Sequence, residues 1–259
     1  MDKITTEELD NLETEELVSR MDEALSSPYW SRMGNKILKL NVCSLYESAT
    51  VKKFDPVFQR KVAYKSFGFL LQLQYSELSS SANFFRLPEK DENGAKQIYW
   101  AARNQWTIVS SRMAFEYFMH LTYMLGSGSD FKSGKSAIKK FKNWLKEREN
   151  PYSYFTISAA RAMQFDRSKR SPEVHATTKL VRRILLMTAS DIDNDVFQLI
   201  NILKNQWQFI LDIAHQREPN GWVSCGNVDD DKEWYGIWES KDYDAISKKI
   251  DEVFVNYEN

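Results

Sequence analysis

The sequence predicts an all-α fold: a single multi-helix domain, with about eight or nine helices around one long buried central helix. Glycine and proline are scarce, at nine and six of 259 residues, which leaves long stretches without a residue that breaks helices. Strand-like alternation of polar and apolar residues is confined to a few residues at a time, with 222–228 as the longest candidate. Hydrophobic residues make up 42% of the chain, enough to build a core.

The central helix is predicted over residues 97–125. This stretch contains neither Pro nor Gly and stops at Gly126, a usual residue at which a helix ends. At 1.5 Å per residue it would be roughly 43 Å long. Its apolar residues occur all the way around the helix, so we expect it to be buried among other helices.

The other elements follow from apolar periodicity and from start signals such as Ser27-Pro28, Asp55-Pro56 and Ser171-Pro172. The segment after Pro219, up to Glu239, is rich in Trp and acidic residues and is predicted to be irregular. Asp191 or Asp193 is expected to cap the helix before it. The predicted helices are 6–25, 28–45, 56–78, 135–148, 151–165, 172–188, 191–215 and 243–257.

One domain is expected over residues 1–259, with the Gly- and Ser-rich loop at 126–134 as the one candidate boundary within it. Two cysteines, Cys43 and Cys225, are too few for a disulfide framework or a four-cysteine zinc site. The acidic N-terminus does not resemble a signal peptide, and no apolar run reaches the roughly 20 residues of a membrane span. We therefore expect a cytoplasmic protein.

No cofactor or metal is expected. Gly134-Lys135-Ser136 lacks the glycine that a phosphate-binding loop has five residues before its final Gly, and a helix precedes it where a strand should be. The aspartates at 191–195 start like an EF-hand loop, but Val196 and Ile202 occupy the positions that require Gly and Glu. Asp229–Asp231 is expected to be an exposed acidic stretch.

Charge is strongly segregated along the chain, although the net charge is only −1. Residues 132–183 contain fourteen basic and four acidic residues, net +10, whereas 1–27 and 228–259 have net charges of −7 and −6. Two interpretations stay open. The basic segment could be a nucleic-acid-binding surface, or the acidic ends could fold over it.

Arg112, Glu116 and His120 follow one another at intervals of four on the central helix and therefore project from nearly the same side. They predict a polar network within an apolar helix. One interpretation is a structural ion pair with a hydrogen-bonded histidine, and the other is a functional cleft in which His120 acts as an acid or base.

Arg170 and His175 form an Arg-x4-His motif in the middle of the basic segment. The motif resembles the Arg-x4–6-His motif of HEPN-type ribonucleases, which are all-helical and commonly dimeric. The resemblance implies metal-independent RNA cleavage, with Arg170 on the scissile phosphate and His175 moving a proton. Ser171 and Pro172 depart from the usual motif. The residues expected to bind phosphates are Arg167, Lys169, Arg182 and Arg183.

Two functions remain open on the sequence. The first is an interaction or regulatory protein that binds a protein partner or nucleic acid without chemistry. The second is a HEPN-like ribonuclease of the toxin or phage-defence type, which forms a homodimer and uses Arg170 and His175. No membrane association is expected in either case.

Overall fold

The computed structural model describes residues 4–26, 40–80, 95–130, 135–147, 189–217 and 228–258. Within these residues the fold class is confirmed: all regular elements are α-helices, ten in number. Two of them, α4 and α5, are single turns. The predicted helices at 151–165 and 172–188, and the strand-like stretch near 222–228, lie outside the described residues.

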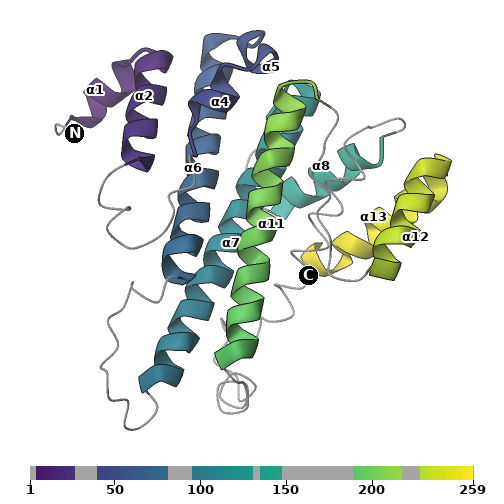
Figure 1. The fold of residues 1–259 in the computed structure, drawn as a ribbon. Coiled ribbons are helices and arrows are strands. Elements are labelled where there is room, and N and C mark those ends of the chain that lie inside the picture. Colours follow the sequence, from purple (N-terminus) through teal and green to yellow (C-terminus); the bar gives the residue numbers. More distant parts are fainter. Residues whose placement is uncertain are drawn as a thin grey trace.

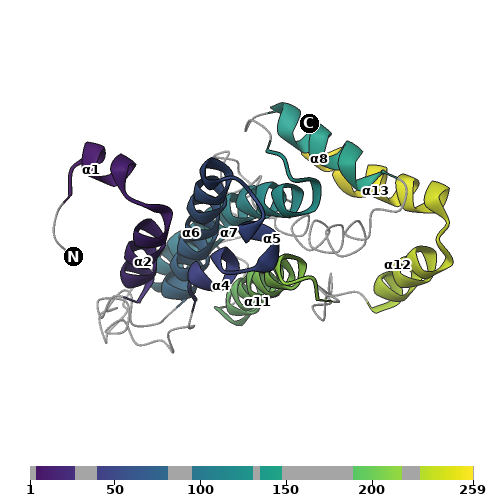
Figure 2. The same cartoon turned by 90° about the horizontal axis from the view of Figure 1, so that it is seen from above.

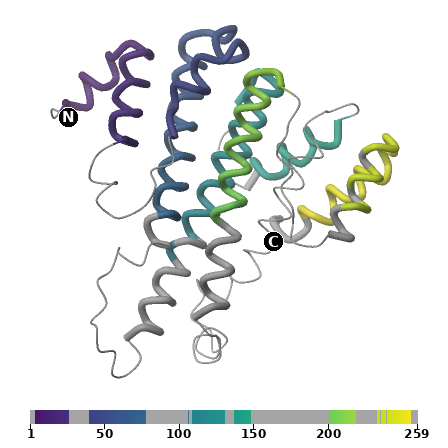
Figure 3. The backbone as a smooth tube through the Cα atoms, in the orientation of Figure 1, coloured from purple at the N-terminus to yellow at the C-terminus, as the bar shows by residue number. Residues whose placement is uncertain are grey.

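Three long helices form the centre of the structure: α6 (Pro56–Ser80), α7 (Ala95–Ser127) and α11 (Ala189–Ala214). They lie side by side in Figures 1 and 3, and α7 packs along both of the others. Aromatic side chains join them. Trp207 of α11 stacks on Phe69 of α6 with ring centroids 5.8 Å apart, and Phe209 lies 5.9 Å from Phe118 of α7. The burial of these large rings fixes the positions of the three helices relative to one another.

Helix α7 is the predicted central helix, and it ends one residue beyond the predicted stop. Gly128 follows it with a φ of +68°, a left-handed conformation that terminates helices and that glycine adopts without a Cβ clash. Residues 114–125 of α7 are mostly buried, as expected. The helix is not buried on all sides along its whole length, however, because Trp106 and Met113 are 59% and 42% exposed.

The N-terminal segment is two helices, so the prediction of one helix over 6–25 was wrong. Helix α1 (Thr6–Asn11) begins with a capping box between Thr5 and Glu8, and α2 (Thr14–Leu25) follows a break at Leu12, whose backbone is extended. Arg60 of α6 donates to the carbonyls of Leu9 and Leu12, at 2.7 and 2.6 Å. These tertiary hydrogen bonds satisfy carbonyls that a continuous helix would have used internally.

Short helices α4 (Cys43–Tyr46) and α5 (Ala49–Lys52) connect the N-terminal pair to α6. The carboxylate of Asp22 in α2 accepts hydrogen bonds from the first amides of α4, and the hydroxyl of Ser48 caps α5. Leu45, expected on the helix over 28–45, is buried within α4. Residues 27–39 lie outside the described part.

Helix α8 (Lys135–Leu145) packs on α7 through an edge-to-face contact between Trp144 and Tyr123, with centroids 5.4 Å apart. The final helix, α13 (Tyr243–Glu258), packs on α8, where Phe254 meets Phe141 at 6.0 Å. Each of these two helices buries one apolar side. Phe141, Trp144 and Leu145 of α8 are buried, as are Ile246, Ile250, Val253 and Phe254 of α13.

Two further boundaries differ from the predictions. The segment expected to be irregular forms α12 (Val228–Ser240), in which the three aspartates fall in the first turn, where the helix dipole favours negative charge. Helix α11 begins at Ala189, so Asp191 and Asp193 lie inside its first turns and neither precedes it as a cap. Seen from above, α1 and α2 lie on one side of the three central helices, and α8, α12 and α13 lie on the other (Figure 2).

Candidate functional site

The residues of the ribonuclease motif cannot be placed from the structure. Arg170 and His175 lie outside the described residues, and so do the four expected phosphate-binding residues Arg167, Lys169, Arg182 and Arg183. The resemblance to HEPN-type ribonucleases therefore stays a prediction. The candidate site described below is built from the two other features that the sequence singled out, the polar network and the basic segment.

The polar network on α7 includes two pairs. Arg112 Nη2 lies 3.2 Å from Glu116 Oε1, one helical turn away, as the spacing predicts. His120 Nδ1 lies 3.1 Å from Oδ1 of Asp130, which follows the end of the helix. The carboxylate of Glu116 is about half exposed, with 55% of its side-chain surface accessible, whereas only 3% of His120 is accessible.

Asp130 is the residue of this network that sequence reasoning missed. The left-handed Gly128 turns the chain back after α7 and places Asp130 beside His120, two turns before the end of the helix. Ser127 also participates in the turn, since its hydroxyl donates to the carbonyl of Tyr123 at 2.7 Å. The Gly-Ser-rich composition at 126–130 indicated a turn, but not which side chain it would deliver.

The surroundings of His120 favour its neutral form. Burial lowers the pKa of His120, and this effect outweighs the hydrogen bond to Asp130, which raises that pKa. The positive charge of Lys65 on α6 lowers it further. A neutral imidazole with its proton on Nδ1 can donate to Asp130, which fixes the tautomer and the ring orientation. Such an arrangement stabilises the turn after α7. A role for His120 as an acid or base stays a prediction.

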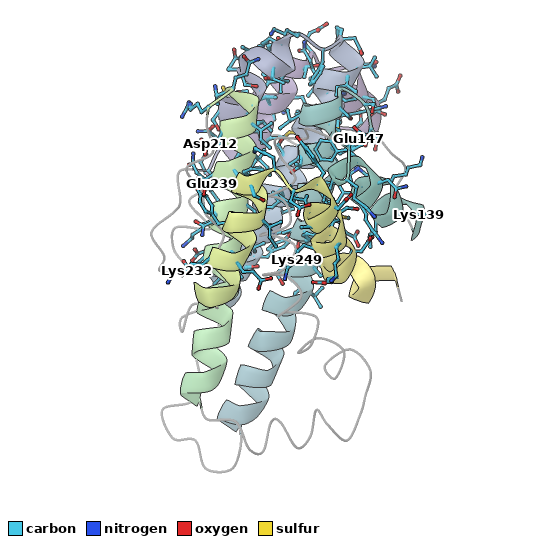
Figure 4. All side chains as sticks on the ribbon, turned by 90° about the vertical axis from the view of Figure 1, so that its right-hand side faces the viewer. Lys139, Glu147, Asp212, Lys232, Glu239 and Lys249 are labelled. Atoms are coloured by element: carbon cyan, nitrogen blue, oxygen red, sulfur yellow. The ribbon has the colours of Figure 1, made fainter. Side chains whose placement is uncertain are left out.

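The described part of the basic segment is α8, and its lysines lie mainly along one face. Lys139, Lys142 and Lys146 follow one another at intervals of three and four, so they share one side of the helix, which we call the lysine face. Phe141, Trp144 and Leu145 occupy a different side and are buried. The apolar seam thus anchors α8 and places the lysine face on the other side of the helix, where Lys139 is exposed and Lys142 and Lys146 are partly buried. Figure 4 shows Lys139 on α8 at the outer edge of the molecule.

An acidic residue of α13 lies on the lysine face. Asp251 of α13 places Oδ1 3.0 Å from Lys142 Nζ and Oδ2 2.8 Å from Lys146 Nζ, so each carboxylate oxygen takes one ammonium group. The hydrogen bond from Lys146, followed by that from Lys142, lowers the pKa of Asp251. The side chain of Lys142 is 14% exposed, that of Lys146 28% and that of Asp251 46%.

The two acidic ends of the chain behave differently. The C-terminal helix α13 covers part of α8, whereas α1 and α2 lie on the opposite side of the central helices (Figures 1 and 2). Acidic side chains of α2 bind elsewhere: Glu15 accepts from Tyr46 at 2.7 Å, and Asp22 caps α4. At the contact between α8 and α13, an acidic end of the chain therefore folds over part of the basic segment. The basic residues from 148 to 183 lie outside the described part.

A second surface lies on the paired helices α6 and α7. A Cβ built on Gly68 would be 2.4 Å from Cζ of Tyr117, so the tyrosine ring lies directly over this glycine. Helical spacing puts further side chains on this side of the pair, one or more turns from the contact. The partly to largely exposed large side chains there are Tyr64 (40%) and Tyr75 (38%) on α6 and Met113 (42%) and Trp106 (59%) on α7. We call these four residues the hairpin apolar face.

Within the described ranges, no three His, Cys, Asp or Glu side chains are grouped so that they could hold a metal ion. Nor does any described helix combine the length and apolar character needed to cross a bilayer. Comparison with known proteins adds no assignment: the chain matches none of the family models, curated proteins or solved structures with which it was compared.

Proposed function

We propose that this chain is a cytoplasmic interaction protein that binds RNA through the lysine face of α8. The observation that carries the proposal is the placement of Lys139, Lys142 and Lys146 along one side of a helix whose other side is anchored by buried aromatic residues, with Lys139 exposed and the other two partly covered by α13. The helix also begins the segment of net charge +10. A row of ammonium groups on one helix attracts the phosphates of a nucleic-acid backbone.

The dimensions of the lysine face suit a nucleic-acid strand. Seven residues separate Lys139 from Lys146, which corresponds to roughly 10 Å along the helix axis at 1.5 Å per residue. A strand of a duplex carries one phosphate about every 3.4 Å of its length, so the face spans about three phosphates. Lysine contacts the backbone as a point charge and carries no base readout, so binding is expected to depend on salt and only weakly on sequence.

The test is fluorescence anisotropy with a labelled single-stranded RNA of about 20 nucleotides, titrated with protein at several salt concentrations. Replacing Lys139, Lys142 and Lys146 together by Gln should weaken binding at least tenfold at low salt. It should also reduce the slope of log K against log salt by up to about 2, because each lost phosphate contact removes about 0.7 for single strands.

The matched control replaces three exposed lysines elsewhere, namely Lys53, Lys61 and Lys232, by Gln. This variant loses the same total charge and should keep most of the affinity. Equal losses in the two variants would show attraction by net charge alone, and an unchanged affinity in the lysine-face variant would overturn the proposal. Failure of the wild type to bind RNA at low salt would overturn it as well.

The hairpin apolar face favours a protein partner as a second candidate function. Monomeric proteins rarely leave several large apolar side chains together on one surface unless that surface binds something. The occupant that we test is a second copy of the chain. Light scattering after size exclusion should then give a dimer for the wild type and a monomer for a variant with Trp106→Gln and Met113→Gln. A wild-type monomer at concentrations up to about 100 μM, well above the Kd range of stable complexes, would exclude this candidate.

A further inference from the structure

We propose that Asp251 occupies, on the lysine face, the position that a backbone phosphate of RNA takes, so that RNA must displace the Asp251 carboxylate from Lys142 and Lys146 to bind fully. This inference rests on the proposed function and concerns the regulation of the same site. In this view the acidic residue of the C-terminal helix competes with RNA for the same two lysines.

The geometry of the contact resembles that of a phosphate clamp. Two ammonium groups, one from Lys142 in the last turn of α8 and one from Lys146 directly after it, converge on one anionic group, with 3.0 Å from Lys142 Nζ to Oδ1 and 2.8 Å from Lys146 Nζ to Oδ2. A phosphodiester likewise presents two charged oxygens on one centre. Because the carboxylate and the phosphodiester would use the same two ammonium groups, they cannot both bind there at full strength.

The third lysine gives RNA a point of first contact. Lys139 is exposed and lies on the same face, one turn before Lys142. It stands at the outer edge of α8 in Figure 4. A strand held at Lys139 is brought next to the Lys142–Lys146 pair, which raises the local concentration of phosphate where Asp251 lies.

The ion pairs of Asp251 have the properties of contacts that can be displaced, whereas the buried apolar side of α13 keeps the helix on α8. Asp251 keeps 46% of its side-chain surface exposed, so its ion pairs are solvated and screened by salt. Among the described elements, α13 packs mainly on α8 and makes a smaller contact with α12. The contact between Phe141 and Phe254 holds the two helices together beside the ion pairs, at a centroid distance of 6.0 Å.

The neighbouring acidic residue of α13 provides a matched comparison. Glu252 adjoins Asp251, but its Oε2 lies 3.7 Å from Lys249 of its own helix. Lys249 also meets Glu233 of α12 at 3.0 Å. A Glu252→Gln variant therefore removes the same charge from the same helix without touching the pair of lysines on α8.

The experiment measures RNA affinity by anisotropy for the wild type, Asp251→Asn and Glu252→Gln, each checked for folding by circular dichroism. Asp251→Asn should tighten binding about threefold to tenfold, because it removes two partly exposed ion pairs that compete with RNA. Glu252→Gln should change the affinity by less than about twofold. Adding Lys142→Gln and Lys146→Gln to Asp251→Asn should abolish the gain.

A second measurement uses the wild-type protein alone, so it does not depend on how Asp251→Asn folds. Hydrogen exchange of the amides in 243–258 should become faster when the RNA is added, because α13 loses its ion pairs to Lys142 and Lys146. Unchanged exchange in bound protein would overturn the inference.

The outcomes separate the inference from the proposed function. If the wild type binds RNA through the lysine face but Asp251→Asn and Glu252→Gln bind equally, competition by Asp251 is wrong and the proposed function stands. A gain that survives loss of Lys142 and Lys146 would also contradict the inference. If neither the wild type nor Asp251→Asn binds RNA, both the proposed function and the inference fail.

Discussion

The imidazole of His120 lies against the carboxylate of Asp130, with 3.1 Å between Nδ1 and Oδ1, although the two residues are ten positions apart. The pair ties the turn after α7 back onto the helix. It also makes the buried histidine sensitive to protonation, since a charged imidazole there would lose its hydration.

The first prediction concerns pH. The folded protein lowers the pKa of His120 below its ordinary value of 6.5, with burial as the largest cause, so the unfolded chain takes up this proton more readily. The contribution of neutral His120 to the stability of the folded protein is therefore fully present above about pH 6.5. It is lost as the pH falls through the lower pKa of the folded state. Thermal unfolding followed from pH 8 to pH 5 should show this loss.

His120→Asn is the informative variant, because its amide can still donate to Asp130 but does not titrate. It should show a shallower decrease of Tm with acidification than the wild type. His215→Gln is the control, since His215 is half-buried and its Nε2 contacts the carbonyl of Ser44 at 2.8 Å. A His120→Asn variant with the same pH slope as the wild type would show that another group causes the acid sensitivity.

The second prediction concerns the contact between α6 and α7. Gly68→Ala places a Cβ 2.4 Å from Tyr117 Cζ and 2.6 Å from its Cε1, so the ring must move. Overpacking of this kind costs about 1–3 kcal/mol, which exceeds the helix propensity of roughly 1 kcal/mol gained by replacing glycine. Urea unfolding should show a lower free energy of unfolding.

Gly236→Ala in α12 is the matched control, because no atom lies within 4 Å of a Cβ built there. It should leave stability unchanged or raise it by up to about 1 kcal/mol. In the double variant Gly68→Ala with Tyr117→Ala, the cost of the alanine at 68 should largely disappear. If Gly68→Ala is as stable as the wild type, the close approach of the two helices is not a constraint.

The third prediction concerns the break between α1 and α2. Arg60→Gln removes the two guanidinium hydrogen bonds, of 2.6 and 2.7 Å, that hold the carbonyls of Leu12 and Leu9. Hydrogen bonds from charged donors are worth about 1.5–3 kcal/mol when their acceptors are shielded, so we expect a destabilisation of about 2 kcal/mol.

The effect should be local, with faster hydrogen exchange in residues 6–25 than in the central helices. Lys61→Gln, at the adjacent exposed position, is the control and should leave both quantities within error. Equal exchange in Arg60→Gln and Lys61→Gln would mean that the break is maintained by the extended backbone at Leu12 and Glu13 alone.

The fourth prediction tests the resemblance to HEPN-type ribonucleases. If it holds, the wild type should cleave labelled RNA in EDTA, and His175→Ala should reduce the rate at least a hundredfold, the usual contribution of general acid–base catalysis. His215→Ala serves as the control for loss of a histidine. Equal cleavage by the wild type and His175→Ala would assign the activity to a contaminant or to another site.

Much of the fold could be predicted because it depends on local patterns. Asp55-Pro56 marked the start of α6, and the absence of Pro and Gly from 97–125 indicated the long helix α7. The pattern does not distinguish α12 from a loop, because aromatic and acidic residues after a Pro-Asn-Gly turn are typical of an irregular segment, although acidic residues in a first turn also favour a helix. The break at Leu12 could not be predicted, since its stabilising partner, Arg60, is 48 residues away.

The sequence by itself determined that the chain is helical, where most helices lie, and that α8 is basic while the ends are acidic, because periodicity and charge are properties of neighbouring residues. Only the tertiary structure decided that Asp130 pairs with His120 and that Asp251 joins Lys142 to Lys146. These contacts depend on how helices pack and on where a turn directs the chain. A carboxylate that could reach many lysines in the extended chain reaches two of them once Phe254 has packed on Phe141.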